Sequence, residues 1–195
     1  MQFNYVRFTE EWATIYKPML HTPGPEGLNR RFFICDSYMN MTSFMEHMDP
    51  ECTPCVIVES QQEGNIQEGR DYPYYSFYFM VRAGNTHEGY SAYDAKNEAK
   101  KVMMDFVNFI RMFKYCQDSE EHYKNLTSLH LDENSYLYSL RESVLNGYNC
   151  MSQINIEDFV YESLNELYDT WYGVQATFED ILLYDMCVDI SLYEE

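Results

Sequence analysis

The sequence predicts a single α+β domain over residues 1–195, in which an antiparallel β-sheet packs against one long helix and several shorter helices. Three observations support this prediction. A chain of 195 residues is long enough for one substantial core but not for two full domains, and no repeat or linker divides it. Several segments alternate apolar and polar side chains, as strands do. Residues 92–115 instead repeat apolar side chains every three or four positions, which is typical of a helix.

The first quarter of the chain predicts a helix, a short strand and a second helix. Apolar residues at helical spacing extend over residues 8–17, with Thr9 as the expected N-cap and Pro18 as the expected stop. Residues 30–35 have the composition of a short strand, and the apolar residues of 38–48 suggest a brief amphipathic helix.

Residues 55–60 (CVIVES) and 74–82 (YYSFYFMVR) predict a β-hairpin joined by turn-forming residues. Because successive side chains of a strand point to opposite faces, the second strand should have two distinct sides. One side carries Tyr75, Phe77, Phe79 and Val81, and the other carries Tyr74, Ser76, Tyr78, Met80 and Arg82.

The long helix is predicted from Ala92 to about Tyr115, with Ser91 as its N-cap and Asp94 three residues later. Its apolar stripe comprises Ala95, Ala99, Val102, Met103, Phe106, Phe109, Ile110 and Phe113. A polar link follows, and then a short helix around residues 136–145 that should end at Asn146 and Gly147.

The acidic, strand-rich end of the chain, about residues 150–190, combines strand-like alternation with a high density of carboxylates. Residues 132–195 contain fourteen acidic side chains and one cation, Arg141, within a chain whose net charge is −19. A disordered acidic tail would lack aromatic residues, whereas this segment is rich in them. We therefore expect two antiparallel strands that form an acidic surface facing a partner or lining a channel.

Composition also limits the kinds of partner that this protein is expected to bind. A sequence pI near 4.4 disfavours binding to DNA or to anionic membranes. Lys96, Lys100 and Lys101 of the long helix are expected to form a solvated face rather than a phosphate site. The absence of a long apolar run and of a leader-like N-terminus predicts a soluble protein made in the cytoplasm, with no membrane partner.

The motif Cys52-Thr53-Pro54-Cys55 is the feature most like an enzyme site, since paired thiols permit disulfide exchange. It runs directly into a strand rather than opening a helix, so we expect two buried, inert thiols; a thiol enzyme is the competing hypothesis. The histidines are scattered, and neighbouring carboxylates on strands point to opposite faces. We therefore expect no catalytic residues, no metal and no cofactor.

The order of elements, and above all the phrase NELYDTWYGVQATFEDILLYD near the end of the chain, resembles tail-terminator and neck proteins of tailed bacteriophages, including neck proteins from phages of gut Bacteroides-type hosts. The resemblance covers roughly Cys55 to Asp189. It implies a non-enzymatic virion protein that forms a homo-oligomeric ring in the neck, between the head-side connector and the tail, with DNA as passing cargo.

On this resemblance, aromatic and methionine side chains of the strands would form the contact between subunits, and acidic side chains would face the channel and repel passing DNA. The expected interface residues are Tyr74, Tyr78, Met80, Trp171 and Tyr172. The expected lumen residues are Glu157, Asp158, Glu179 and Asp180. The alternative function is an acidic DNA mimic or inhibitor that binds a basic nucleic-acid-handling protein.

Overall fold

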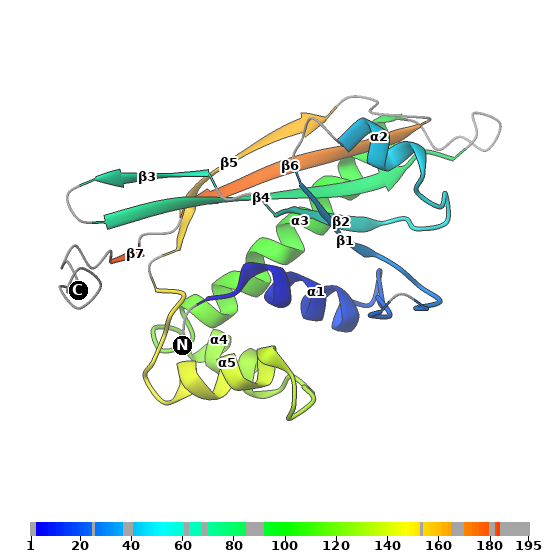
Figure 1. The fold of residues 1–195 in the computed structure, drawn as a ribbon. Coiled ribbons are helices and arrows are strands. Elements are labelled where there is room, and N and C mark those ends of the chain that lie inside the picture. The colour runs from blue at the N-terminus through cyan, green and yellow to red at the C-terminus, as the bar shows by residue number, and fades with distance from the viewer. Residues whose placement is uncertain are drawn as a thin grey trace, which may run out of the picture.

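The structure is a computed structural model of the chain. The structure describes residues 3–24, 26–36, 41–60, 63–67, 70–84, 92–152, 154–164, 170–179 and 182–183. These residues form helices on both sides of a single mixed, mostly antiparallel sheet, so the predicted α+β class is confirmed (Figure 1).

The described helices are α1 (Tyr5–Ile15), α2 (Met41–Glu46), α3 (Ala92–Lys114), α4 (Glu120–Thr127) and α5 (Tyr136–Leu145). The described strands are β1 (Phe32–Cys35), β2 (Cys55–Glu59), β3 (Glu63–Gln67), β4 (Arg70–Arg82), β5 (Asn155–Leu164), β6 (Trp171–Glu179) and β7 (Leu182–Leu183).

Strand β4 is the centre of the sheet, whose strand order is β1-β2-β4-β6-β5. The thirteen residues of β4 pair antiparallel with β2 and β3 on one side and with β6 and β7 on the other. The predicted pairing of residues 55–60 with 74–82 and that of the two closing strands are both confirmed. Strand β1 adds to β2 in parallel, so β1 and β5 end this strand order, while β3 and β7 each pair with β4 at its other end.

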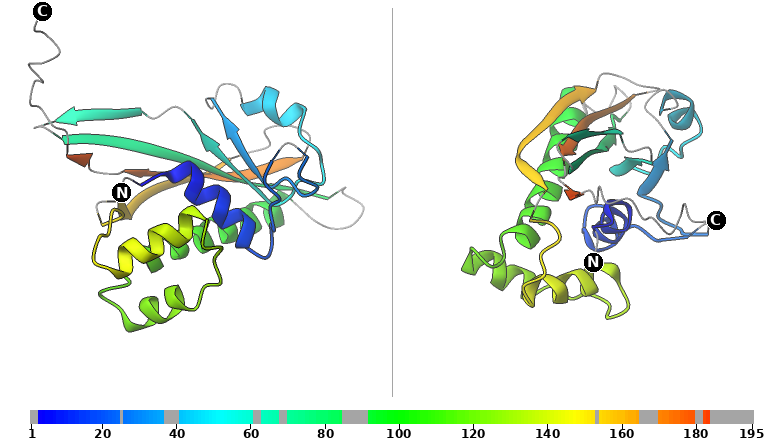
Figure 2. Two further views of the ribbon diagram at one scale, coloured as in Figure 1. Left: turned by 60° about the horizontal axis from the view of Figure 1, so that its bottom comes forward. Right: turned by 60° about the vertical axis from the view of Figure 1, so that its left-hand side comes forward.

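The main core lies between the sheet and helices α1 and α3, on what we call the inner face (Figure 2). Phe106 of α3 is fully buried there, and its ring centroid lies 4.8 Å from that of Trp12 in α1 and 5.1 Å from that of Phe77 in β4. The inner side of β4 is the one predicted from alternation, because Tyr75, Phe77, Phe79 and Val81 all belong to this core. The predicted apolar stripe of α3 is buried here too, with Phe109 only partly so.

The opposite, outer face carries the short helix α2 and a smaller apolar cluster beneath it (Figure 1). Each side of the sheet thus has its own hydrophobic cluster, and the strands separate them.

Helices α4 and α5 form a second helical layer beyond α1 and α3 (Figure 2). The start of α5 is fixed to α1, because Glu11 accepts hydrogen bonds from the backbone N–H groups of Tyr136 (2.8 Å) and Leu137 (2.7 Å). The Tyr136 hydroxyl in turn accepts one from the Asn4 N–H at 2.7 Å.

Some local predictions were wrong. Helix α1 begins five residues earlier than Thr9 would allow: its N-cap is Asn4, which accepts from the Arg7 N–H, while Thr9 is buried within the helix. Residues expected to form only a turn include β3, and the polar link contains α4. The predicted cap at Ser91 lies outside the described residues.

Among the described residues, no helix combines the length and apolar character needed to cross a membrane.

Candidate functional site

Three of the five predicted interface residues lie under α2 rather than at the surface. Tyr78 and Met80 are fully buried and Trp171 is 2 % exposed, all within the outer cluster. The Tyr78 hydroxyl also donates to the Glu59 carboxylate at 2.9 Å. Helix α2 covers this end of the outer face, so none of these three side chains offers surface for the predicted subunit contact.

The other two predicted interface residues differ in exposure. Tyr74, on the outer face, is 39 % exposed. Tyr172 points to the inner face, where it is partly buried against the main core and the Lys96 ammonium lies 5.7 Å from its ring centroid. Only Tyr74 of the original set therefore presents substantial apolar surface.

The outer face beyond α2 forms what we call the open sheet surface. It consists of Tyr74 and Ser76 of β4, Gln175, Thr177 and Glu179 of β6, and Val160 and Glu162 of β5. No described helix covers it. Val160 is 70 % exposed, directly opposite Thr177, whose hydroxyl lies 3.5 Å from that of Ser76. Val160 was missed in the sequence because alternation alone does not show which strand face remains uncovered.

The predicted acidic residues are divided between two places. Glu157 of β5 lies against the end of α3, where it accepts from the Tyr115 hydroxyl at 2.8 Å and approaches Arg111 at 3.8 Å. Burial, followed by the hydrogen bond to Glu157, raises the pKa of Tyr115 to about 12. Glu157 is thus held in place by α3 while its side chain remains 60 % exposed.

Glu179 lies on the open sheet surface, opposite Tyr74 in the register of β4 and β6. Its negative charge raises the pKa of the Tyr74 hydroxyl. The side chain of Asp158 and all of Asp180 lie outside the described part of the structure. The structure therefore does not bring the four predicted lumen residues together into one described cluster.

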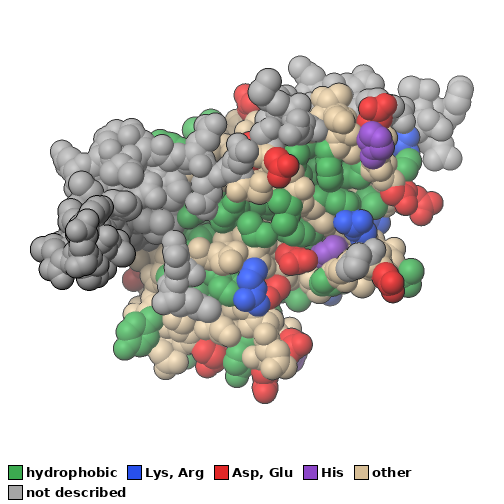
Figure 3. All heavy atoms as spheres, viewed as in Figure 1, with side chains coloured by type: hydrophobic (Ala, Val, Ile, Leu, Met, Phe, Trp, Pro, Cys, Tyr) green, Lys and Arg blue, Asp and Glu red, His purple; other side chains and the backbone are tan. Residues whose placement is uncertain are grey.

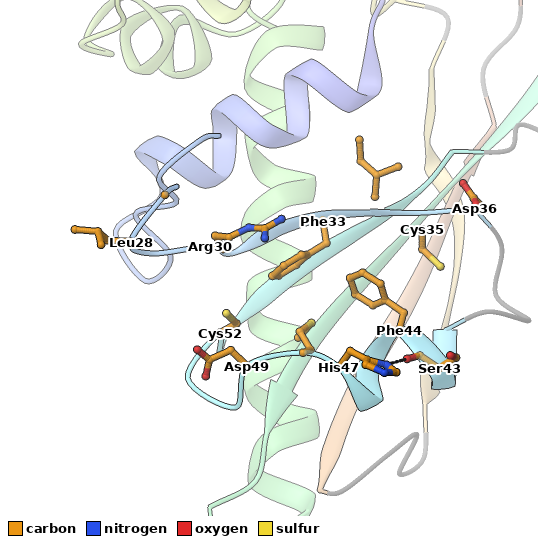
Figure 4. Close-up of a pocket in the computed structure, with 13 residues that line it drawn as sticks. Leu28, Arg30, Phe33, Cys35, Asp36, Ser43, Phe44, His47, Asp49 and Cys52 are labelled. Atoms are coloured by element: carbon orange, nitrogen blue, oxygen red, sulfur yellow. Dashed lines mark hydrogen bonds between the residues drawn. The ribbon is translucent and has the colours of Figure 1, made fainter. Parts of the chain in front are cut away.

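A cleft of about 730 Å³ lies between β1 and α2 (Figure 4). Its walls combine apolar and polar side chains: the rings of Phe33 and Phe44 face each other edge to face, with centroids 5.6 Å apart. The Arg30 guanidinium lies 5.5 Å from the Phe33 centroid, and His47 is oriented by a 2.9 Å hydrogen bond from Nδ1 to the Ser43 carbonyl. Sequence reasoning missed this cleft because its lining comes from separate segments.

In the view of Figure 3, hydrophobic side chains gather over β1 and β2, between α2 and α1. Ile34 is 49 % exposed at this edge, and Leu28, which also lines the cleft, is fully exposed. Apolar surface is therefore continuous from the β1 edge into the cleft.

The paired cysteines occupy this region but have the wrong electrostatics for a thiolate nucleophile. Cys52 lines the cleft, and Cys55 is fully buried at the start of β2. Burial raises the pKa of both thiols, whereas reactive cysteines require a lowered pKa. This environment disfavours the thiol-enzyme hypothesis.

Lys100 and Lys101 of α3 are exposed, as expected of a solvated face, while Lys96 and Lys100 each also lie over a tyrosine ring of the sheet. The Lys100 ammonium donates to the Tyr161 hydroxyl at 2.9 Å and lies 4.9 Å from the same ring's centroid. Within the described ranges, no group of three or more His, Cys, Asp or Glu side chains is arranged to hold a metal ion.

Comparison with models of protein families finds no match to this chain, and a search of curated proteins finds none either.

Proposed function

We propose that this chain is a structural subunit that self-associates into a ring in the neck of a tailed phage, where it joins the head-side connector to the tail and lets DNA pass. The open sheet surface carries the proposal. A strand face that holds an exposed valine and a half-exposed tyrosine beside polar side chains has the mixed character of a subunit contact.

The revised contact replaces the buried residues of the sequence-based set. Tyr74 remains, and Val160 takes the place of Tyr78, Met80 and Trp171. These two residues lie two strands apart on the same face, so one flat contact can cover both.

The distribution of charge supports the same proposal. Edge strand β5 carries Glu157 and Glu162 at exposed positions, and the neighbouring strand β6 carries Glu179. In a ring whose lumen includes this edge, carboxylates would repel the phosphate backbone and keep passing DNA from adhering. Some of the acidic residues of 157–189 would then face the channel, and the protein would reside in the virion.

A test combines electron microscopy with mass measurement by light scattering. The wild-type chain should form closed rings, and Val160→Asp should weaken them because it places a charge within an apolar contact. Tyr148→Asp is the matched control, since Tyr148 is 75 % exposed after the end of α5, away from the sheet.

A chain that stays monomeric at every concentration contradicts the ring. Salt-sensitive capture of a basic nucleic-acid-handling protein by that monomer would instead support the acidic-mimic alternative.

A further inference from the structure

The residues after β7 have the sequence pattern of one more strand. From position 186 to 193 every second side chain is apolar, which gives a strand one apolar face and one mixed face. The apolar face would comprise Met186, Val188, Ile190 and Leu192, and the other face Cys187, Asp189, Ser191 and Tyr193. We call residues 186–192 the closing segment; it lies outside the described residues.

Strand β1 offers an edge to which such a strand can add. The carbonyl groups of Arg31 and Cys35 accept from the N–H groups of Val56 and Ser60 at 2.9 and 2.8 Å, so alternate residues of β1 bond toward β2. The backbone groups of the intervening Phe32 and Ile34 therefore point to the opposite side. No described strand pairs with β1 on that side.

The β1–α2 cleft lies along the same edge, and part of its mixed lining is apolar and can contact apolar side chains. Phe33 and Phe44 form its walls, and the exposed Ile34 and Leu28 lie at its border. An added strand would satisfy the edge groups of β1 and cover this apolar surface at once.

We propose that the closing segment of one copy adds to β1 of a second copy as an antiparallel strand, with its apolar side chains in the β1–α2 cleft. This inference rests on the proposed self-association and names a second contact between neighbouring subunits, besides that of the open sheet surface.

The charges that flank the closing segment favour its addition to β1 over its addition to β5. The closing segment is flanked by Asp185, Glu194 and Glu195, and β5 already carries exposed carboxylates that would repel it. Strand β1 instead follows Arg30 and Arg31.

The same charges set the direction of the added strand. Arg31 Nη1 is buried without a hydrogen-bond partner in the described structure, and Asp36 follows the far end of β1. Antiparallel addition places Glu194 and Glu195 beside the two guanidinium groups, whereas parallel addition would place them near Asp36.

The register of the sheet excludes one pairing within a single copy, that of Val188 with Cys35. Leu183 pairs with Arg70, whereas Cys35, through Glu59 and the pairing of Val58 with Phe77, is level with Ser76. That offset is about 20 Å along β4, and the four strand spacings from β7 across β4, β2 and β1 to an added strand amount to about 19 Å. Leu183 and the position beside Cys35 on that added strand are therefore about 28 Å apart. The five residues from Leu183 to Val188 span at most about 18 Å. The closing segment therefore cannot place Val188 beside Cys35 of its own β1.

Two pairs of full-length variants test the contact by the concentration at which half of the chains assemble. The double variant Val188→Asp with Ile190→Asp places charges on the apolar face and should raise this half-assembly concentration about tenfold or more. The double variant Cys187→Asp with Ser191→Asp adds the same charge to the other face and should change the half-assembly concentration far less. Ile34→Pro removes an edge N–H and should have the same effect as the first pair, whereas Ile34→Val retains that N–H and should not. Circular dichroism verifies that each variant is folded.

A cross-linking experiment identifies the copy that donates the strand. A photoreactive benzoylphenylalanine at position 191, in an equal mixture of unlabelled and nitrogen-15-labelled chains, should cross-link to residues 30–36, and about half of the cross-linked peptides should combine the two isotopes. Cross-links confined to chains of one isotope would overturn addition between copies.

The outcomes separate the two proposals. A wild-type chain that assembles, with both the apolar-face variant and Ile34→Pro unaffected, overturns this inference and leaves the ring intact. Loss of assembly in the apolar-face variant alone overturns the assignment to β1. A wild-type chain that remains monomeric overturns both proposals.

Discussion

His21 is a buried histidine that fixes the start of β1. Its Nδ1 accepts a hydrogen bond from the Arg31 N–H at 3.0 Å, and the side chain is 4 % exposed. Burial, the largest cause, lowers its pKa below the ordinary value of 6.5, even though the nearby Glu10 acts in the opposite direction. The folded state therefore favours the neutral imidazole, and its accepting nitrogen is lost on protonation.

This lowered pKa predicts acid sensitivity. Because the unfolded chain binds a proton more readily, the stabilisation is fully present above pH 6.5 and is lost as the pH falls through the lower, folded-state pKa. Urea unfolding at pH 7 and pH 5 should show a decrease in the free energy of unfolding that is smaller in His21→Asn, which keeps an acceptor but does not titrate. Equal decreases in both proteins would contradict this role.

Gly173 marks a close approach between β6 and β4. A Cβ atom at this position would lie 2.3 Å from Met80 Sδ and 2.7 Å from the Phe79 carbonyl oxygen. Met80 can move, but the backbone oxygen cannot without disturbing the ladder. We predict that Gly173→Ala lowers the free energy of unfolding by about 1–3 kcal/mol, measured by urea denaturation. Thr177→Ala, in the same strand at a partly exposed position, should cost less than about 1 kcal/mol.

The residue scale also shows how far the sequence could predict the site. Alternation assigned Tyr78 and Met80 to the correct side of β4, but it carried no information on what would cover that side. Tyr74 and Val160 are exposed because α2 ends before their part of the sheet. Exposure here is a tertiary property, so a local pattern could not supply it.

At the scale of elements, Glu11 of α1 holds the first turn of α5. Glu11 satisfies two of the N–H groups that a helix start leaves without intrahelical partners, and its charge also matches the positive end of α5. Ser135 caps the same helix by accepting from the Tyr138 N–H at 3.0 Å.

Removal of Glu11 should therefore loosen the α5 layer. We predict that Glu11→Ala lowers the free energy of unfolding by about 1–3 kcal/mol, because two partly buried donors lose their acceptor. Relative to the wild type, Glu11→Ala should accelerate amide hydrogen exchange more in α5 than in α3. Glu121→Ala is the control, since Glu121 is exposed in the first turn of α4; an equal cost for both substitutions would exclude a special role for Glu11.

Elements with a strong internal pattern were predicted well, and the others were not. Helix α3 buries a continuous apolar stripe, and the bounds of α5 match the prediction. Helix α4 buries only Leu126 and is otherwise polar, so its sequence resembles a loop. Strand β3 contains few β-formers and depends on pairing with the long β4. The parallel pairing of β1 with β2 leaves no signature within either strand.

At the scale of the whole molecule, the net charge of −19 opposes self-association. We predict that moderate salt increases the mass of the assembled species, because screening reduces repulsion between acidic subunits while apolar contacts persist. Light scattering at about 0.05 and 0.3 M salt measures this effect, with the Debye length shrinking by about half or more. Dissociation on adding salt would contradict assembly through apolar contacts.

The position of β4 in the sequence has a consequence for synthesis. Its partner β6 lies far along the chain, with Arg82 opposite Trp171 and Tyr74 opposite Glu179. At roughly 5–20 residues per second, translation needs about 5–20 s to deliver β6 after β4 has been made. During that interval the central strand has an unpaired side that could bind other nascent chains. We therefore predict that co-expression with a chaperone that shields unpaired strands raises the soluble yield.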